Sequence, residues 1–175
     1  MGFRIYLVYP AGEESGAAMK KEPSAERYVY LSREYSRGFI ADLGIEAIHY
    51  ERGYLESRLV ILPRHRQQDD YIHAGVLATM ADHTAGYAAF SLVAEDFRIL
   101  TVEFKINFFR PAFGQSLICK SRILREGRKI LVGESDVFDQ RPKGEVLSAK
   151  ALVTLMAVHK NNIKSVKPGN GLNER

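Results

Sequence analysis

The sequence predicts an α+β fold in which one long central helix is wrapped by an antiparallel β-sheet of about five to six strands. Residues 73–93 form a long run of mostly small and apolar helix-forming residues. On both sides of this run, short alternating segments are separated by turns that contain Gly or Pro. Two strands, then the helix, then four strands is an order typical of α+β domains, because the strands come in runs.

The central helix, expected over residues 73–93, has an unusually apolar surface. Beyond its first residue, the only ionisable side chains are Asp82, His83 and Tyr87. A surface helix of this length normally has a polar stripe, so we expect this one to be buried between the sheet and a second copy of the chain. A buried carboxylate without a partner is costly. Asp82 is therefore either a hydrogen-bonded anchor in the core or a catalytic group.

The other elements follow from periodicity and turn signals. Ser24 is expected to cap a helix that extends to about Arg37 and is ended by Gly38. A polar loop is expected over residues 63–71. In the strand after the central helix, alternation places an apolar row on one face and Thr101 on the other. The row is Val102, Phe104, Ile106 and Phe108, and the expected strands are Ile45–Tyr50, Tyr54–Leu62, Arg98–Phe109, Ser116–Arg125, Lys129–Gln140 and Glu145–His159.

The chain is expected to contain one domain. Residues 1–23 are interpreted as an N-terminal extension, with a possible short strand over 3–9, followed by a linker. Residues 24–159 form the predicted domain, and the polar residues 160–175 are expected to be a disordered tail. At 175 residues, the chain is long enough to bury a substantial core.

Composition excludes several function classes. The net charge of +4 is mild, and no basic stripe or nucleic-acid module is present, so no nucleic-acid partner is expected. The single cysteine, Cys119, precludes an intramolecular disulfide and fits a cytoplasmic location. Asp82 and His83 near the middle of the apolar helix argue against a membrane span. The histidines do not have the spacing of metal ligands, so no metal site is expected.

Two segments together resemble the PaaI-like branch of the hotdog-fold acyl-CoA thioesterases. The first is the helix start at residues 73–75, His-Ala-Gly, followed by Asp82 nine positions after His73. The second is the strand at residues 101–112, Thr-Val-Glu-Phe-Lys-Ile-Asn-Phe-Phe-Arg-Pro-Ala. The resemblance covers about residues 38–158. It implies a hotdog fold, acyl-CoA thioester substrates and a homodimer or a dimer of dimers, with no cofactor because coenzyme A is part of the substrate.

Thioester hydrolysis needs a donor for the developing oxyanion and a carboxylate that attacks the thioester or activates water. The backbone N–H of Ala74 lies at the expected helix N-terminus, where unpaired donors favour an oxyanion. Asp82 is the only carboxylate on the helix and is the candidate nucleophile or general base. The resemblance adds Thr101, which would orient Asp82 or the water, and a glutamine, Gln67 or Gln68, near the thioester oxygen.

The sequence departs from the family pattern at three positions. Ala74 replaces the first glycine of the family's His-Gly-Gly, Gln67 stands where an asparagine is common, and Asp70 stands where a glycine is common. Ala74 keeps its N–H but adds a methyl group at the point of substrate approach. These differences affect the fine geometry of the predicted site and leave the fold assignment unchanged.

A distance argument predicts a site shared between two chains. Ala74 and Asp82 are eight residues apart on one helix, which separates them by about 12 Å. A single thioester carbon cannot be within about 3 Å of both an oxyanion donor and a carboxylate that lie so far apart. If both residues serve one reaction, they come from different subunits, and a monomer is inactive.

The remaining candidates have mainly structural interpretations. His73 is expected to hydrogen-bond at the helix start, and His83 to point about 100° away from Asp82. Gly75 belongs to the same helix-start motif and is expected to contact substrate. The phenylalanines at 104, 108, 109 and 113 are expected to lie mostly in the core, with some lining an acyl pocket. Candidate contacts for the phosphates of coenzyme A are Arg110, Arg128 and Lys129.

The sequence therefore predicts an acyl-CoA thioesterase and leaves two alternatives. A hydratase is disfavoured because no Asp and His occur in an Asp-x-x-x-x-His arrangement. A non-catalytic module that binds or senses acyl-CoA is disfavoured because such a protein has no need of an unpaired carboxylate on a buried helix. The acyl group, the role of Asp82 as nucleophile or base, and the choice between dimer and tetramer stay open at this point.

Overall fold

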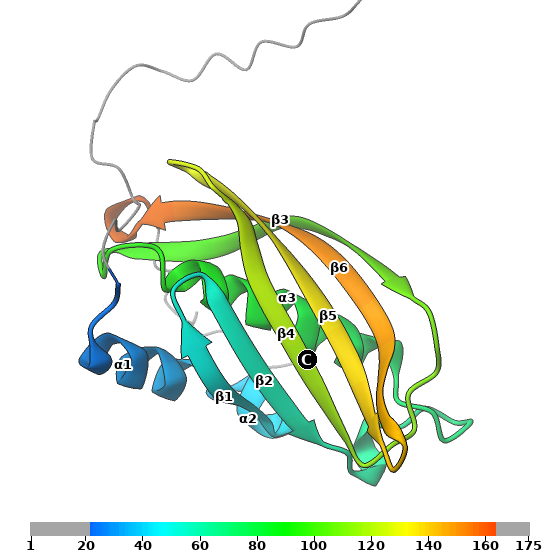
Figure 1. Cartoon of the computed structure of the whole chain (residues 1–175). Helices are drawn as coiled ribbons and strands as arrows, with labels where there is room; N and C mark the ends of the chain where they lie inside the picture. Colours follow the sequence, from blue (N-terminus) through cyan, green and yellow to red (C-terminus); the bar gives the residue numbers. More distant parts are fainter. Residues whose placement is uncertain (1–21, 164–175) are drawn as a thin grey trace, which may run out of the picture.

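The computed structural model describes residues 22–163 and shows a six-stranded antiparallel sheet curved around one long helix (Figure 1). Helix α3 (Ala74–Phe90) lies against the sheet, and α1 (Ala25–Tyr35) and α2 (Phe39–Leu43) precede the first strand. The strands are β1 (Ile45–Glu51), β2 (Tyr54–Val60), β3 (Phe97–Phe108), β4 (Ser116–Glu126), β5 (Ile130–Arg141) and β6 (Gly144–His159). The predicted α+β class and hotdog arrangement are confirmed.

The strand order is β1-β2-β4-β5-β6-β3, which leaves β1 and β3 at the two edges of the sheet. The predicted hairpins join β1 to β2, β4 to β5, and β5 to β6. Gly53 has φ +73° in the first of these turns and Gly144 has φ +122° in the last. Only glycine adopts such backbone angles readily, so both turns depend on these residues.

The core lies between α3 and the concave side of the sheet. Leu55, Leu117, Leu131 and Leu155 point inward from four different strands and are almost fully buried, as is Met80 of the helix. Several buried hydroxyls between the helix and the sheet are paired with one another. The hydroxyl of Thr84 lies 2.8 Å from that of Ser57 and 3.1 Å from that of Tyr35. These bonds satisfy polar groups that water cannot reach.

Within one chain, α3 is buried on only part of its surface, and the burial of its other face by a second copy stays a prediction. The sheet covers the face that contains Leu77, Met80 and Ala81. The opposite face is half-buried or exposed, although α1 covers it in part. This open face comprises Ala74, Gly75, Ala78, Thr79, Asp82, His83, Gly86 and Tyr87.

The N-terminal helix begins as predicted but ends earlier. The side chain of Ser24 accepts a hydrogen bond from the Arg27 N–H at 3.2 Å, and Leu31 and Tyr35 are fully buried. The helix ends at Tyr35, and Gly38 with φ +55° instead begins α2, a helix that the sequence did not predict. The predicted strand over residues 3–9 and most of the linker lie outside the described residues.

Strand β3 contains a β-bulge that overturns the prediction about Thr101. Thr101 pairs with Leu155 of β6, and Glu103 pairs with the next residue of β6, so Val102 has no direct partner. The extra residue shifts the alternation. Thr101 therefore shares the helix-facing side of the sheet with Phe104 and Ile106, whose partners Val153 and Ala151 are buried.

The expected burial of four phenylalanines is wrong for a single chain. Their exposed fractions are 38% for Phe104, 49% for Phe108, 51% for Phe109 and 48% for Phe113. The first two belong to β3, which is an edge strand and has no neighbour on its outer side in the part of the chain that the structure describes. An apolar edge strand of this kind is a surface on which another chain can pair.

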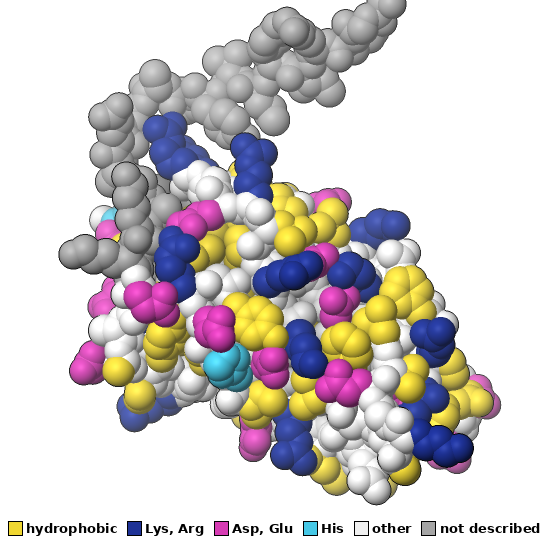
Figure 2. Space-filling view, in the orientation of Figure 1, with side chains coloured by type: hydrophobic (Ala, Val, Ile, Leu, Met, Phe, Trp, Pro, Cys, Tyr) yellow, Lys and Arg dark blue, Asp and Glu magenta, His cyan; other side chains and the backbone are white. Residues whose placement is uncertain are grey.

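The outer face of the sheet differs from this edge. In Figure 2, charged side chains of both signs alternate with hydrophobic ones across it. Arg122 and Lys150 both form ion pairs with Glu134 there, and Lys120 pairs with Glu145. Among residues 22–163, no helix is long and apolar enough to cross a membrane.

Candidate active site

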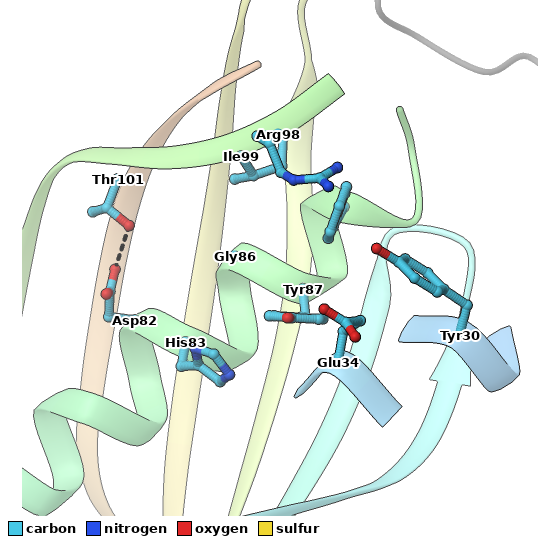
Figure 3. A pocket seen from close by; sticks show the side chains of 10 residues that line it. Tyr30, Glu34, Asp82, His83, Gly86, Tyr87, Arg98, Ile99 and Thr101 are labelled. Atoms are coloured by element: carbon cyan, nitrogen blue, oxygen red, sulfur yellow. Dashed lines mark hydrogen bonds between the residues drawn. The ribbon is translucent and has the colours of Figure 1, made fainter. Parts of the chain in front are cut away.

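Asp82 lies half-buried on the open face of α3, opposite the bulge of β3. The Thr101 hydroxyl donates a hydrogen bond to Asp82 Oδ1 at 2.8 Å, as Figure 3 shows. The other carboxylate oxygen, Oδ2, has no hydrogen-bond partner within residues 22–163. A hydrogen bond of this kind fixes the carboxylate and leaves one oxygen free to act on a substrate.

The bulge and a hydrogen bond from the sheet together position Asp82. Without the bulge, Thr101 would lie on the outer face of the sheet, out of reach of the helix. On the inner side, the Ser135 hydroxyl of β5 donates to the Ala81 carbonyl at 2.7 Å. This bond holds α3 to the sheet immediately before Asp82. Two strands thus fix the carboxylate. Strand β5 holds the backbone of the preceding residue, Ala81, and strand β3 holds the side chain of Asp82 itself.

A cleft of about 210 Å³ opens beside the carboxylate. Its floor is α3, and β3 and α1 form its two sides (Figure 3). The lining combines aromatic groups with a few polar ones, which is typical of small-molecule sites. The lining residues are Tyr30, Glu34, Asp82, His83, Gly86, Tyr87, Phe90, Arg98, Ile99 and Thr101.

His83 also lines the cleft, but the structure places its ring nitrogen against α1. His83 Nε2 donates to the Tyr35 carbonyl at 3.0 Å, and the ring packs on those of Tyr35 and Tyr87 at centroid distances of 4.5 and 4.8 Å. Burial lowers the pKa of His83, because the charged imidazolium loses its hydration. These contacts agree with the predicted structural role.

The second group of predicted residues gathers at the start of α3. His73 is the N-cap, and its Nδ1 accepts a hydrogen bond from the Gly75 N–H at 2.9 Å. The Val76 N–H bonds to the His73 carbonyl at 2.9 Å. The Ala74 N–H has no partner within residues 22–163. An unpaired N–H at a helix N-terminus is suited to bind an oxyanion.

Gly75 is required by the histidine cap. A Cβ atom at this position would lie 2.9 Å from His73 Nδ1 and 3.3 Å from its Cε1, so the imidazole would have to move. In the preceding loop, Asp70 has φ +63°, the left-handed conformation that glycine adopts most readily. Asp tolerates this conformation better than most residues, so the loop keeps its turn at Asp70 without a glycine.

Ala74 opens into a separate cavity of about 260 Å³. Gln67 and Arg110 line the same cavity, so three residues predicted from different segments come together here. Gln68 is absent from this lining. The other lining residues are Tyr71, Ile72, Leu77, Phe108, Phe109, Pro111 and Ala112.

Two predicted phosphate contacts do not lie near this cavity. Arg128 and Lys129 belong to the turn between β4 and β5. Arg110 lies near the far end of β5, because the Arg141 side chain donates to the neighbouring Pro111 carbonyl at 2.8 Å. The 12 residues of β5 separate the two regions by about 36 Å. Within one chain, Arg110 is therefore the only one of the three that lies beside Ala74.

Several residues at these cavities were not predicted. Arg64 and Arg66 line a cleft of about 340 Å³ with His73 and Gly75. At the Asp82 cleft, Tyr30, Arg98 and Gly86 were missed. Only Gly86 left a signal in the sequence, because a glycine in the middle of a helix is unfavourable and calls for an explanation.

The chain is similar to known thioesterases in both sequence and structure. The family model for the thioesterase superfamily matches residues 70–146, which include α3, β3 and the greater part of the sheet. A thioesterase family protein from Silicibacter pomeroyi is 32% identical, with a TM-score of 0.72 over 75% of this chain and 98% of that one. The chain belongs to the thioesterase superfamily. The predicted enzyme class, a thioester hydrolase, is thereby confirmed.

Other solved structures share the fold. A conserved protein from Pseudomonas aeruginosa is 28% identical, with a TM-score of 0.65 over 73% of this chain and 99% of that one. The PaaI protein from the phenylacetic acid degradation operon of E. coli is 19% identical, with a TM-score of 0.66 over 75% and 92% of the two chains. At this level of identity, the likeness to PaaI concerns the fold.

Proposed function

We propose that this member of the thioesterase superfamily hydrolyses acyl-CoA thioesters to the free acid and coenzyme A. The observation that supports the proposal best is the pair of free polar groups on α3. Among residues 22–163, the Ala74 N–H has no partner at the helix start, and one oxygen of Asp82 has none two turns later. A donor and a carboxylate are the groups that thioester hydrolysis needs.

In the proposed reaction, the thioester oxygen accepts a hydrogen bond from the Ala74 N–H. Asp82 either attacks the thioester carbon or removes a proton from a water that attacks it. If Asp82 attacks, the carbon–sulfur bond breaks to leave an anhydride between the acyl group and Asp82, and water then hydrolyses it to the free acid and the restored carboxylate. If water attacks, the same bond breaks and the acid forms directly. In both routes the thiolate of coenzyme A takes the proton that the water gives up. Thr101 keeps the carboxylate oriented through its hydrogen bond to Oδ1. The groups involved are side chains and backbone of the protein, and no metal or redox cofactor is invoked.

The two groups are proposed to meet across a dimer interface. Ala74 and Asp82 line separate cavities in one chain and are about 12 Å apart along the helix. The open face of α3 and the apolar edge strand β3 meet beside these two residues. Phe104 of β3 lines a cavity together with Asp82, and Phe108 of β3 lines the cavity at Ala74. Pairing of two copies along this side would cover both features and bring Ala74 of one chain toward Asp82 of the other.

Contacts to the rest of the substrate follow from the cavity at Ala74. Gln67 is proposed to bond near the thioester oxygen, because it shares that cavity with the free N–H. Arg110, at the same cavity, is proposed to contact a phosphate of coenzyme A. Gly75 allows His73 to cap the helix and so keeps the Ala74 N–H directed to the substrate.

The proposal is tested with wild type and Asp82→Asn on acetyl-, hexanoyl-, benzoyl- and palmitoyl-CoA, following release of free thiol. We expect Asp82→Asn to lower kcat at least about 100-fold, the usual effect of removing a positioned base or nucleophile, with an unchanged circular dichroism spectrum. Equal turnover by the variant would contradict the role of Asp82. Tight binding of these compounds by a wild type without turnover would instead identify a binding module.

A second measurement separates the two roles of Asp82. If the carboxylate attacks the thioester, an anhydride forms, and its hydrolysis at the Asp82 carbonyl during repeated turnover in ¹⁸O-labelled water places the label in the Asp82 side chain. If Asp82 activates water, the label enters only the product acid. Mass spectrometry of the peptide that contains Asp82 distinguishes the two results.

A further inference from the structure

Gly86 is the one residue of the Asp82 cleft that local structure does not explain. It lies inside α3 with ordinary helical backbone angles, and glycine is among the least favourable residues there. A Cβ atom at this position would have nothing within 4 Å among the described residues, 22–163. Neither backbone conformation nor packing within the chain therefore requires glycine. What the glycine does provide is empty space on the floor of the cleft.

The position of Gly86 relates this space to the reacting group. Asp82, Gly86 and Phe90 are spaced four residues apart, so they form one row along α3. All three line the cleft of about 210 Å³. A group that extends from a thioester at Asp82 along this row passes directly over Gly86. In Figure 3, Ile99 and Arg98 of β3 lie along one side of this path, and Tyr30 of α1 lies at its end.

Phe90 marks the far end of the row and is held firmly. The Arg27 guanidinium lies 4.7 Å from the centre of its ring, and the Arg98 guanidinium lies 5.6 Å from it. Arg27 also donates to the Phe90 carbonyl at 3.2 Å. Contacts of two cations with one aromatic ring fix its position. The cleft thus has a defined floor at Gly86 and a defined end at Phe90.

We infer that Gly86 is a specificity-determining residue that admits acyl groups about as large as a benzene ring into this cleft. The inference rests on the proposed function and adds the size class of the acyl group. An apolar cavity of about 150 Å³ holds benzene, and this cleft is larger, at about 210 Å³, with Ile99, Tyr87 and Phe90 in its lining. A side chain at 86 would occupy the path, whereas groups as small as acetyl stop before reaching it.

The test compares Gly86→Ala and Gly86→Leu with wild type on acetyl-, hexanoyl- and benzoyl-CoA. Both substitutions remove the flexibility of glycine and favour the helix, so they differ mainly in the volume of the new side chain. Gly86→Leu is expected to lower kcat/KM for benzoyl- and hexanoyl-CoA at least about tenfold more than for acetyl-CoA, since one methylene in a pocket changes discrimination by about 10- to 200-fold. Gly86→Ala should have a smaller effect in the same direction.

Binding provides a readout that does not depend on hydrolysis. The uncleavable thioethers S-ethyl-CoA and S-benzyl-CoA are titrated calorimetrically into each protein. Gly86→Leu should weaken S-benzyl-CoA selectively, with an unchanged oligomeric state by light scattering. An equal loss for all substrates and thioethers, or dissociation of the oligomer, would overturn the inference. If Gly86→Leu weakens the binding of S-benzyl-CoA more than that of S-ethyl-CoA but no thioester is hydrolysed, the inferred size of the acyl group stands and the proposed hydrolysis fails.

Discussion

At the scale of single residues, the Thr101–Asp82 hydrogen bond holds the carboxylate in one orientation, whereas without it the carboxylate could rotate freely. The bond is 2.8 Å long and joins an exposed edge strand to the central helix. Thr101 is exposed, and its bond is the one hydrogen bond of the Asp82 side chain within residues 22–163. The contribution of the hydroxyl to catalysis can therefore be measured with little effect on the core.

Thr101→Val removes this donor and keeps the shape of the side chain. We expect kcat to fall about tenfold, because the carboxylate loses its fixed orientation, while the loss for Asp82→Asn is larger. Thr101→Ser should retain most activity, since it keeps the hydroxyl. Steady-state kinetics with one acyl-CoA measure kcat for both variants. Activity of Thr101→Val equal to that of Thr101→Ser would remove the hydroxyl from the mechanism.

His83 provides a prediction about pH and stability. Its pKa is lowered by burial, so near pH 6.5 the unfolded chain binds more protons at this residue than the folded chain does. The folded state is therefore stabilised above pH 6.5, and this contribution is lost as the pH falls below that value. His65 is also fully buried with a lowered pKa, so it adds to the same loss.

His83→Gln should retain most activity and make the melting temperature fall less steeply between pH 7.5 and pH 5.5. Glutamine keeps an N–H for the Tyr35 carbonyl but cannot take up a proton in this range. The slope that remains should be attributable to His65. A loss of activity as large as that of Asp82→Asn, at an unchanged melting temperature, would assign His83 to catalysis instead.

At the scale of elements, the start of α3 is stabilised by an interaction between His73 and Gly75 that excludes a side chain at 75. Gly75→Ala is expected to displace the imidazole, remove the cap and lower kcat/KM about tenfold, although the Ala74 N–H remains. The double variant His73→Ser/Gly75→Ala should recover part of the loss, since serine caps a helix and is smaller. A double variant that is no more active than Gly75→Ala would contradict this account of the cap.

The strands and the central helix were predictable from the sequence because their signals are local. Alternation and turn residues located all six strands, and the small apolar residues located α3 to within a few residues. Helix α2 was missed because its five residues are too few to show a period. The face of Thr101 was predicted wrongly because a β-bulge depends on the partner strand, β6, and nothing in β3 itself reveals it.

The candidate site was predictable only in part. The helix motif indicated His73, Ala74 and Asp82, and among residues 22–163 the Ala74 N–H and one oxygen of Asp82 have no hydrogen-bond partner. The residues around the Asp82 cleft come from α1, α3 and β3, which approach each other only in the folded chain. Arg98 and Tyr30 therefore could not be found from spacing, because no motif connects them to Asp82.

At the scale of the whole molecule, one chain presents two separate cavities, at Ala74 and at Asp82, and, within residues 22–163, an apolar edge strand without a neighbour. Val102, Phe104 and Phe108 of β3 are all more than a third exposed. Their burial by a second copy is part of the proposed function, and it explains why the predicted core residues of this strand are exposed in a single chain. The residue that supplies the oxyanion donor and the residue that supplies the carboxylate are then on different subunits.

The central claim is tested most directly by mixing two inactive variants, Ala74→Pro and Asp82→Asn. Proline removes the N–H of residue 74 and should be tolerated, because that N–H has no partner within residues 22–163 and His73 has φ −61° and ψ 133°, as the residue before a proline requires. Folding and dimerisation of each variant are first confirmed by circular dichroism and light scattering.

In a mixed dimer, one site combines an intact Ala74 from one chain with an intact Asp82 from the other, while the second site has neither. Random mixing makes half of the dimers mixed, so co-refolding should restore about a quarter of wild-type activity if the sites are independent. The mixed dimers are isolated with two different affinity tags, and thiol release from an acyl-CoA is measured. Activity well above that of both parents is the predicted result. Mixed dimers that fold correctly and remain as inactive as the parents would contradict the shared site.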